Sequence, residues 1–190
     1  MPEPARRPAL QQRVTAAILD GAAQIFAVQG EQASMNDVAD AAGVARATVY
    51  RYFPNRDALL DELARAAVAD VEARLQSARI DAVTPEEGIA RAVRALVDTG
   101  DSFVLLARER RRSEPERFER QVVQPLRRLF ERGQDAGDIR GDITGARLAE
   151  SLIGLIVGLL TSTPALGKED MTATITGLFL DGSRARGPRR

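Results

Sequence analysis

The segment 34–53 constrains the fold of this chain more than any other part of the sequence. A small residue, Ala39, is followed four positions later by Gly43 and six positions after that by the β-branched Val49. Gly43 can end a helix in a left-handed backbone conformation. Ala39 lets a second helix cross closely, and Val49 points back into the angle between the two helices. This spacing predicts two short helices joined by a tight turn.

The first of these helices has a capping signal at its start. Ser34 is a favourable N-cap residue, and Asp37 stands three positions later. In this arrangement the Ser34 side chain accepts from the backbone of Asp37, and the Asp37 carboxylate accepts from the backbone of Ser34. The pair predicts that the helix begins directly after Ser34.

The second helix is basic. The residues from Gly43 to Arg56 include three Arg and no acid, although 27 basic and 27 acidic residues give the whole chain a formal charge of zero. Arg side chains bind guanine edges and phosphates, and hydroxyl groups bind phosphate oxygens. The segment therefore suits the major groove of DNA. For the segment alone, the alternative is a solvated basic turn between two core helices.

With these residues in place, the sequence resembles the tetracycline-repressor (TetR) family of bacterial transcription regulators. The resemblance covers residues 14–63, about a third of the chain, and includes an amphipathic helix, the run GEQASMNDVA and the run AGVARATVYRYFPNRDALL. The sequence departs from the family pattern twice. Ala45 stands where the family often has a capping, phosphate-binding Ser or Thr. Arg56 stands where it usually has Lys, which keeps the charge but alters the geometry.

The resemblance implies which residues contact DNA. Arg46 and Arg51 are the candidates for base edges, and Ala47 for a thymine methyl group. Asn36 is expected to reach a flanking base or phosphate, and Arg56 to pair with a backbone phosphate near the positive end of its helix. The predicted DNA-binding site also includes Ser34. It is completed by three residues that are expected to bind phosphates: Thr48, Tyr50 and Tyr52.

The remaining sequence predicts an all-α fold of about nine helices. Apolar residues recur at spacings of three and four, and no convincing strand pattern is present. Pro125 is expected to kink the helix that contains it. Besides the pair within 34–53, the predicted helices span residues 11–29, 55–80, 85–99, 102–112, 115–135, 144–162 and 169–182.

These helices predict a three-helix DNA-binding domain followed by a larger helical domain for ligand binding and dimerisation. Pro and Arg residues at the start and Arg, Gly and Pro at the end predict disordered termini. The predicted divisions are a disordered arm over 1–10, the DNA-binding domain over 11–56, the effector-binding and dimerisation domain over 57–183, and a disordered basic tail over 184–190.

The helix over 144–162 is apolar almost all round between residues 148 and 160. Its continuous apolar run, 152–160, is far shorter than the ~20 residues that a bilayer span needs, so we expect burial. Gly154 and Gly158 leave a flat strip for another helix. One interpretation is an internal core helix; the other, implied by the resemblance, is a two-fold interface between subunits. The predicted interface residues are Leu152, Leu155, Ile156, Gly158, Leu159, Ile175, Leu178 and Phe179.

The middle helices raise the question of a ligand. Their apolar residues can pack solidly or line a cavity near Pro125, and the resemblance implies a cavity for a small effector. Arg110 follows Phe103 by seven residues on about the same helical face, so it is a candidate anchor for an acidic ligand, although a solvated charge cluster is the favoured explanation. The predicted pocket residues are Leu96, Phe103, Leu106, Arg110, Phe118, Val122 and Leu126.

Composition narrows the chemistry. The chain contains no Cys and no His, which removes the usual zinc sites, Cys or His nucleophiles and disulfides. No nucleophile–base pair, phosphate-cradling Gly loop or metal cluster is recognisable, so we expect neither an enzyme nor a cofactor. With no visible signal peptide or membrane span, the expected location is the cytoplasm.

The preferred hypothesis is a homodimeric regulator, acting as a repressor, that a small-molecule effector releases from a palindromic operator in double-stranded DNA. Two reading heads related by a two-fold axis would contact half-sites about 34–36 Å apart. The alternative hypothesis, which the missing hydroxyl at Ala45 favours, is a protein-binding or scaffolding dimer that has lost DNA binding.

Overall fold

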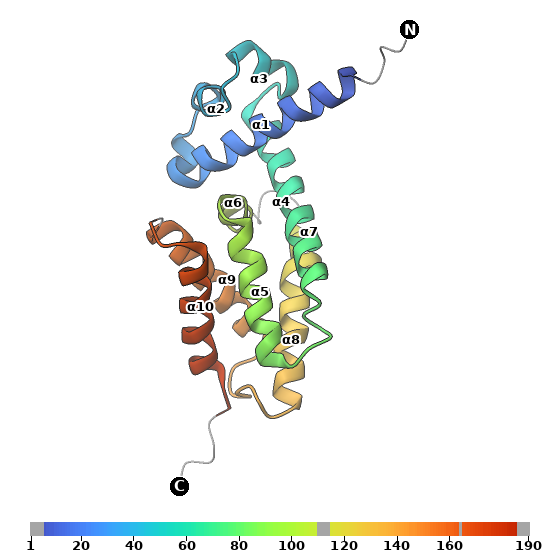
Figure 1. Cartoon of the computed structure of the whole chain (residues 1–190), viewed down its shortest axis with the longest axis vertical. Helices are drawn as coiled ribbons and strands as arrows, with labels where there is room; N and C mark the ends of the chain where they lie inside the picture. Colours follow the sequence, from blue (N-terminus) through green and yellow to red (C-terminus); the bar gives the residue numbers. More distant parts are fainter. Residues whose placement is uncertain (1–5, 110–114, 164, 186–190) are drawn as a thin grey trace.

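The computed structural model describes residues 6–109, 115–163 and 165–185, and within them it confirms the all-α fold. In Figure 1 a head of three helices, α1 to α3, sits above a body formed by α5 to α10, and α4 leads from one to the other. The elements are α1 (Arg6–Gln29), the 3-10 turn η1 (Gly30–Gln32), α2 (Met35–Ala41), α3 (Arg46–Tyr52), α4 (Arg56–Ala78), α5 (Pro85–Thr99), α6 (Asp101–Glu109), α7 (Pro115–Phe118), the π-helical η2 (Glu119–Val123), α8 (Gln124–Asp135), α9 (Gly145–Ser162) and α10 (Lys168–Ser183).

The helix over residues 115–135 was expected to kink at Pro125, and the structure shows how the chain accommodates this proline. Since proline has no N–H, the carbonyl of Gln121 cannot receive the usual bond from position 125. The backbone widens into the π-helical η2 just before it, and the N–H of Gln124 donates to the carbonyl of Glu119. Because α7, η2 and α8 are continuous, the described ranges hold nine helical segments, as expected.

The described structure extends into both of the terminal segments that were predicted to be disordered. The arm over 1–10 was predicted to be disordered, yet α1 begins at Arg6. Pro8 is compatible with this start because the first N–H groups of a helix have no partner within it. The tail over 184–190 was also predicted to be disordered, but the N–H groups of Arg184 and Ala185 donate to the carbonyls of Leu180 and Asp138. Residues 1–5 and 186–190 lie outside the described ranges.

Two apolar cores divide the molecule. The head core joins α1, α2 and α3 to the first part of α4, and the body core runs from the rest of α4 through α10. Along α4, Leu63 belongs to the head core and Ala64 to the body core. The predicted domain boundary at residue 56 therefore stays a proposal, and the packing favours a division inside α4. Leu105 of α6 also packs into the head core, so α6 is a second link between the two parts.

Gly21 allows α1 and α2 to come together. A Cβ atom at this position would lie 2.8 Å from the backbone nitrogen of Ala42, closer than real Cβ contacts. The last turn of α2 therefore rests directly on the backbone of α1. A glycine inside an otherwise amphipathic helix is the sequence signal for such a contact.

Candidate DNA-binding interface

The structure confirms the predicted helix-turn-helix. Ala39 is 3% exposed and Val49 is 0% exposed, and both lie in the angle between α2 and α3. Gly43 has a φ of +64°, in the left-handed region, and the N–H of Val44 donates to the carbonyl of Ala39. The turn thus supplies a hydrogen-bond donor to a carbonyl near the end of α2 and redirects the chain into α3.

The capping box at the start of α2 is also confirmed. The backbone N–H of Asp37 donates to the Ser34 hydroxyl oxygen, and the backbone N–H of Ser34 donates to the Asp37 carboxylate. The Ser34 hydroxyl donates to the same carboxylate at 2.6 Å. These bonds, the hydroxyl's above all, lower the pKa of Asp37 below its ordinary value. The hydroxyl hydrogen of Ser34 is thereby directed to Asp37 and away from an incoming phosphate.

At the start of α3, Ala45 is the N-cap and provides no side-chain cap, as its sequence implies. The helix begins there all the same, because the Ala45 carbonyl accepts the N–H of Thr48 at 2.8 Å. The missing hydroxyl therefore leaves the backbone of α3 in place.

The predicted contact residues differ in how far they face solvent. Arg46, Ala47, Tyr50 and Arg51 are exposed on α3, whereas Thr48 and Tyr52 are half-buried. Tyr52 packs against the head core. Ser34 and Asn36 are exposed at the start of α2. The structure thus leaves six residues of the predicted set exposed on the helix-turn-helix: Ser34, Asn36, Arg46, Ala47, Tyr50 and Arg51.

Each arginine of α3 lies over a tyrosine. The guanidinium carbon of Arg46 is 5.5 Å from the centre of the Tyr50 ring, and that of Arg51 is 5.3 Å from the Tyr52 ring. A cation within about 6 Å of an aromatic centre is attracted to the ring face. The stacking gives each guanidinium a preferred direction before DNA arrives: Arg46 lies along the exposed side of α3, and Arg51 is held beside the half-buried Tyr52.

Sequence reasoning missed part of this surface. A hollow of about 760 Å³ lies between α1 and α3, and Gln11, Gln12 and Thr15 line it together with Arg51 and Tyr52. These three polar residues lie in the first half of α1, where Gln11 and Gln12 are exposed and Thr15 is half-buried. Their polar character on the outer face was visible in the sequence, but only the fold places that face beside α3.

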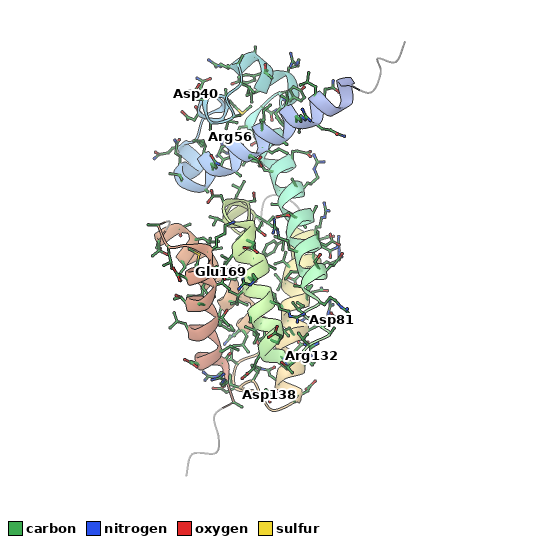
Figure 2. The ribbon with its side chains drawn as sticks, in the orientation of Figure 1. Asp40, Arg56, Asp81, Arg132, Asp138 and Glu169 are labelled. Carbon is green, nitrogen blue, oxygen red and sulfur yellow. The ribbon has the colours of Figure 1, made fainter. Side chains whose placement is uncertain are left out.

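Arg56 has partners inside the protein. It was predicted to bind a DNA phosphate, but its Nη2 donates to the carbonyl of Gly30 at 3.2 Å and its guanidinium carbon lies 4.9 Å from the centre of the Phe26 ring. Figure 2 labels Arg56 beside α1, next to the top of α4. The side chain is half-buried and is not part of the exposed group on α3.

Half of the predicted dimer interface faces the protein's own core. Leu152, Ile156 and Ile175 are 0% exposed and Phe179 is 8% exposed, so these four side chains are unavailable to a partner. An apolar helix does not reveal from its sequence which side faces its own subunit. Of the remaining predicted residues, Leu178 is 60% exposed and Gly158 is half-buried with open space at its Cβ position, whereas the half-buried Leu155 and Leu159 also pack against the body core.

The described side chains predicted to line an effector pocket are at most 2% exposed and belong to the body core. They are Leu96, Phe103, Leu106, Phe118, Val122 and Leu126. Arg110 lies outside the described residues. Packing therefore favours the solid arrangement at this place. A crevice of about 530 Å³ lies instead between the C-terminal half of α4 and the rod formed by η2 and α8.

The described residues also bear on metal binding and on membrane insertion. Within the described residues, no group of three or more Asp, Glu, His or Cys is placed to hold a metal ion. In the same ranges one helix, α9, is long and apolar enough by composition to cross a bilayer, and 33% of it is buried. Its buried face packs into the body core, which is the arrangement expected of a core helix.

Comparison with known proteins agrees with the helix-turn-helix. Residues 18–63 match the profile of the bacterial regulatory proteins of the tetR family. The transcriptional regulator NfxB of Pseudomonas aeruginosa is 26% identical over 164 residues, which cover 82% of this chain and 87% of NfxB. The transcriptional repressor LfrR of Mycolicibacterium smegmatis is 38% identical over 100 residues, which span only half of LfrR (50%) and 52% of this chain.

Solved structures show the same fold over nearly the whole chain. LfrR of Mycobacterium smegmatis in complex with proflavine has a TM-score of 0.73 at 22% identity, covering 91% of this chain and 97% of LfrR. The ketosteroid regulator KstR2 of Mycobacterium tuberculosis has a TM-score of 0.71 at 18% identity, covering 90% of this chain and 95% of KstR2.

The fold and its exposed basic helix define a DNA-binding transcriptional regulator of the helix-turn-helix class. More particularly, the chain is similar to the TetR family of bacterial regulators, in sequence over residues 18–63 and in fold over nearly its whole length.

The capping box makes the head sensitive to acid. Because folding lowers the pKa of Asp37, this carboxylate stabilises the folded state at pH values above its ordinary pKa of about 3.8, and the contribution is lost as pH falls through the lowered value. Asp37→Asn should therefore lower the midpoint of thermal unfolding at pH 6, and the difference from wild type should shrink towards pH 3. Asp40→Asn, the same charge change on the same helix without the Ser34 contacts, is the control. Equal shifts for both variants at every pH would contradict this role.

Proposed function

We propose that the protein is a homodimeric repressor that binds a palindromic operator and is released by a small-molecule effector. The observation that carries the proposal is the exposed, ring-stacked Arg46 at the start of α3, the second helix of the helix-turn-helix. As the relatives are transcriptional regulators, we propose no enzymatic activity. The expected site of action is the cytoplasm, where bacterial DNA lies.

Arg46 and Arg51 lie in different surroundings on α3, which supports different roles in DNA binding. Arg46 stands at the first position of α3 on its exposed side, and we assign it to base edges in the major groove. Arg51 borders the hollow with Gln11 and Gln12, where amide and guanidinium donors lie together. Such a group of donors suits the phosphate backbone, so we assign Arg51 to phosphate in place of the base contact inferred from sequence.

Substitution of these arginines tests DNA binding and this division of labour. With DNA from the region flanking its own gene, Arg46→Ala should lose about 1–3 kcal/mol of preference for the operator over altered half-sites. Arg51→Ala should weaken all sequences alike and flatten the dependence of log affinity on log salt by roughly 0.9 per subunit.

Arg65→Ala is the matched control, since Arg65 is exposed on α4 and pairs with Glu62 away from α3. If wild type and both variants show the same weak, sequence-independent binding, the regulator hypothesis gives way to a protein-binding dimer.

The outer side of α9 and α10 supports dimerisation. A Cβ atom added at Gly154, Gly158 or Gly177 would meet nothing within 4 Å, so these positions lie open. Leu155 and Leu178 flank them, and Leu178 is 60% exposed. Small residues let helix backbones approach closely, and the flanking leucines supply apolar area to bury. The face therefore fits the same face of a second copy, as a two-fold axis requires.

Gly158→Arg tests this interface. A Cβ atom at this position meets no atom of its own subunit within 4 Å, so the fold should be retained while the arginine side chain blocks the close approach of a second copy. We expect the wild type to elute as a dimer in size-exclusion chromatography with light scattering, and Gly158→Arg to shift to the monomer mass. Ala73→Arg, at an exposed position of α4, serves as the control. A dimer mass for Gly158→Arg would rule out this face.

The crevice beside α4 is the proposed effector site. Leu75, Ile80, Pro125 and Leu129 give it apolar walls, and Glu72 adds a carboxylate. Because Arg120, Arg128 and Arg132 also line the crevice, an apolar body with hydrogen-bonding groups would match these walls. The solved complex of LfrR with proflavine, a relative by fold, makes proflavine a reasonable first probe.

The position of the crevice supports an effect of ligand binding on DNA binding. One wall is α4, which continues into the head, and the other is the η2–α8 rod. Arg132 of α8 donates to the carbonyls of Ile80 and Val83 at 2.8 and 3.0 Å, which holds the end of this crevice in place. A ligand that binds more tightly when α4 is displaced would shift the population towards a form in which the two heads no longer match the operator.

Filling the crevice tests the effector site. Gln76 is exposed at its edge, so Gln76→Trp should occupy the space and leave operator affinity without ligand unchanged. Proflavine titration should release wild-type protein from its operator, whereas Gln76→Trp should need at least about tenfold more ligand, a loss of ~1.4 kcal/mol. Ser77→Trp, one position away and outside this crevice, is the control. Equal release of wild type and Gln76→Trp would place the effector elsewhere.

A further inference from the structure

Arg56 occupies the junction between the head and α4. It is the first residue of α4, and the carbonyl it contacts belongs to Gly30, at the end of α1. Gly30 has a φ of +59°, and its carbonyl also accepts the N–H of Ala33 across η1. The guanidinium thus meets the backbone where the chain leaves α1 and turns towards α2.

The Arg56 side chain is held by specific contacts inside the protein. Phe26, only 1% exposed, presents its ring to the guanidinium at 4.9 Å, and the Nε of Arg56 is buried without a hydrogen-bond partner among the described residues. An unpaired buried donor is unfavourable, so the side chain's position must be maintained by the ring and the carbonyl. A group destined only for a DNA phosphate would gain more by keeping its donors in water until DNA binds.

We propose that Arg56 is a positioning residue that fixes the end of α1 to the start of α4, and that it is not a phosphate ligand. We call the contact of Arg56 with Phe26 and the Gly30 carbonyl the Arg56 brace. It sets the orientation of the reading helices on α4, so that the head turns with α4 as one body. This inference deepens the proposed function and rests on it.

Phosphate binding and positioning make different demands on the side chain. A phosphate ligand needs charge, which Lys also supplies as a point charge. The brace needs the planar fork that stacks on a ring and donates at the same time. It also needs Phe26, which is buried in the head core and cannot touch DNA.

The experiment compares Arg56→Gln, Arg56→Lys, Phe26→Leu and the Arg56→Gln/Phe26→Leu pair with wild type. Affinity for operator DNA is measured at several salt concentrations, at a temperature where circular dichroism shows each variant folded. Hydrogen exchange of the amides at 30–35 is followed without DNA. Arg65→Gln controls for loss of a charge on α4, and Arg51→Gln supplies the reference for loss of a phosphate contact.

The Arg56 brace predicts that Arg56→Gln and Arg56→Lys both bind the operator roughly fivefold to thirtyfold more weakly, with an unchanged salt slope. Phe26→Leu should act likewise, and the pair should be no weaker than the worse single variant. Amides at 30–35 should exchange faster in all of them and as in wild type for Arg65→Gln.

Two results would overturn the proposal. In the first, the salt slope flattens by roughly 0.9 per subunit for Arg56→Gln and Arg56→Lys restores the affinity, which would make Arg56 a phosphate ligand. In the second, affinity or exchange at 30–35 is unchanged in Arg56→Gln. If wild type binds no DNA at all, the proposed function fails, and the exchange data still decide whether the brace exists. If Phe26→Leu does not fold, the Gln and Lys variants alone separate the alternatives.

Discussion

The rest of the structure depends on the apolar stripe of α4, which is shared between two cores. Leu59, Leu60 and Leu63 pack with the head, and the stripe from Ala64 onward packs with the body. Since the helix is continuous from Arg56 to Ala78, a single element spans both cores. Regular i to i−4 hydrogen bonding makes this rod stiff over its whole length. The DNA-reading surface and the crevice near Leu75 are therefore mechanically joined without a separate linker.

The head attaches to this rod through a few contacts of different kinds. The Arg56 brace holds α1 at the top of α4, and Leu105 of α6 reaches into the head core from the body. The close contact of Gly21 with the backbone at Ala42 keeps α2 against α1. Such direct contacts leave little room for α2 and α3 to move by themselves. A shift of the head thus carries Arg46 and Arg51 together.

Sequence reasoning was accurate where the physics is local. The N-cap at Ser34, the left-handed Gly43 and the disturbance at Pro125 depend on residues within about five positions of one another, and all three appear in the structure. The start of α1 was placed five residues too late because Pro8 suggests disorder, although a helix tolerates proline in its first turn. Similarly, the predicted tail begins with Arg184, whose side chain donates to the Glu86 carboxylate, and Ala185, whose N–H donates to the carbonyl of Asp138; both partners are far away in the sequence.

By itself, the sequence determined the all-α fold, the helix-turn-helix and the basic character of α3, because periodicity, caps and charge are read from neighbouring residues. Only the tertiary structure decided which apolar faces are covered. It turned Leu152, Ile156 and Ile175 inward, filled the expected pocket with side chains and opened a crevice beside α4. It also gave Arg56 the Phe26 ring and the Gly30 carbonyl as partners. A helix that is apolar on several sides can bury more than one of its faces. An arginine within reach of both protein and solvent likewise has more than one favourable position. Long-range packing selects among these alternatives.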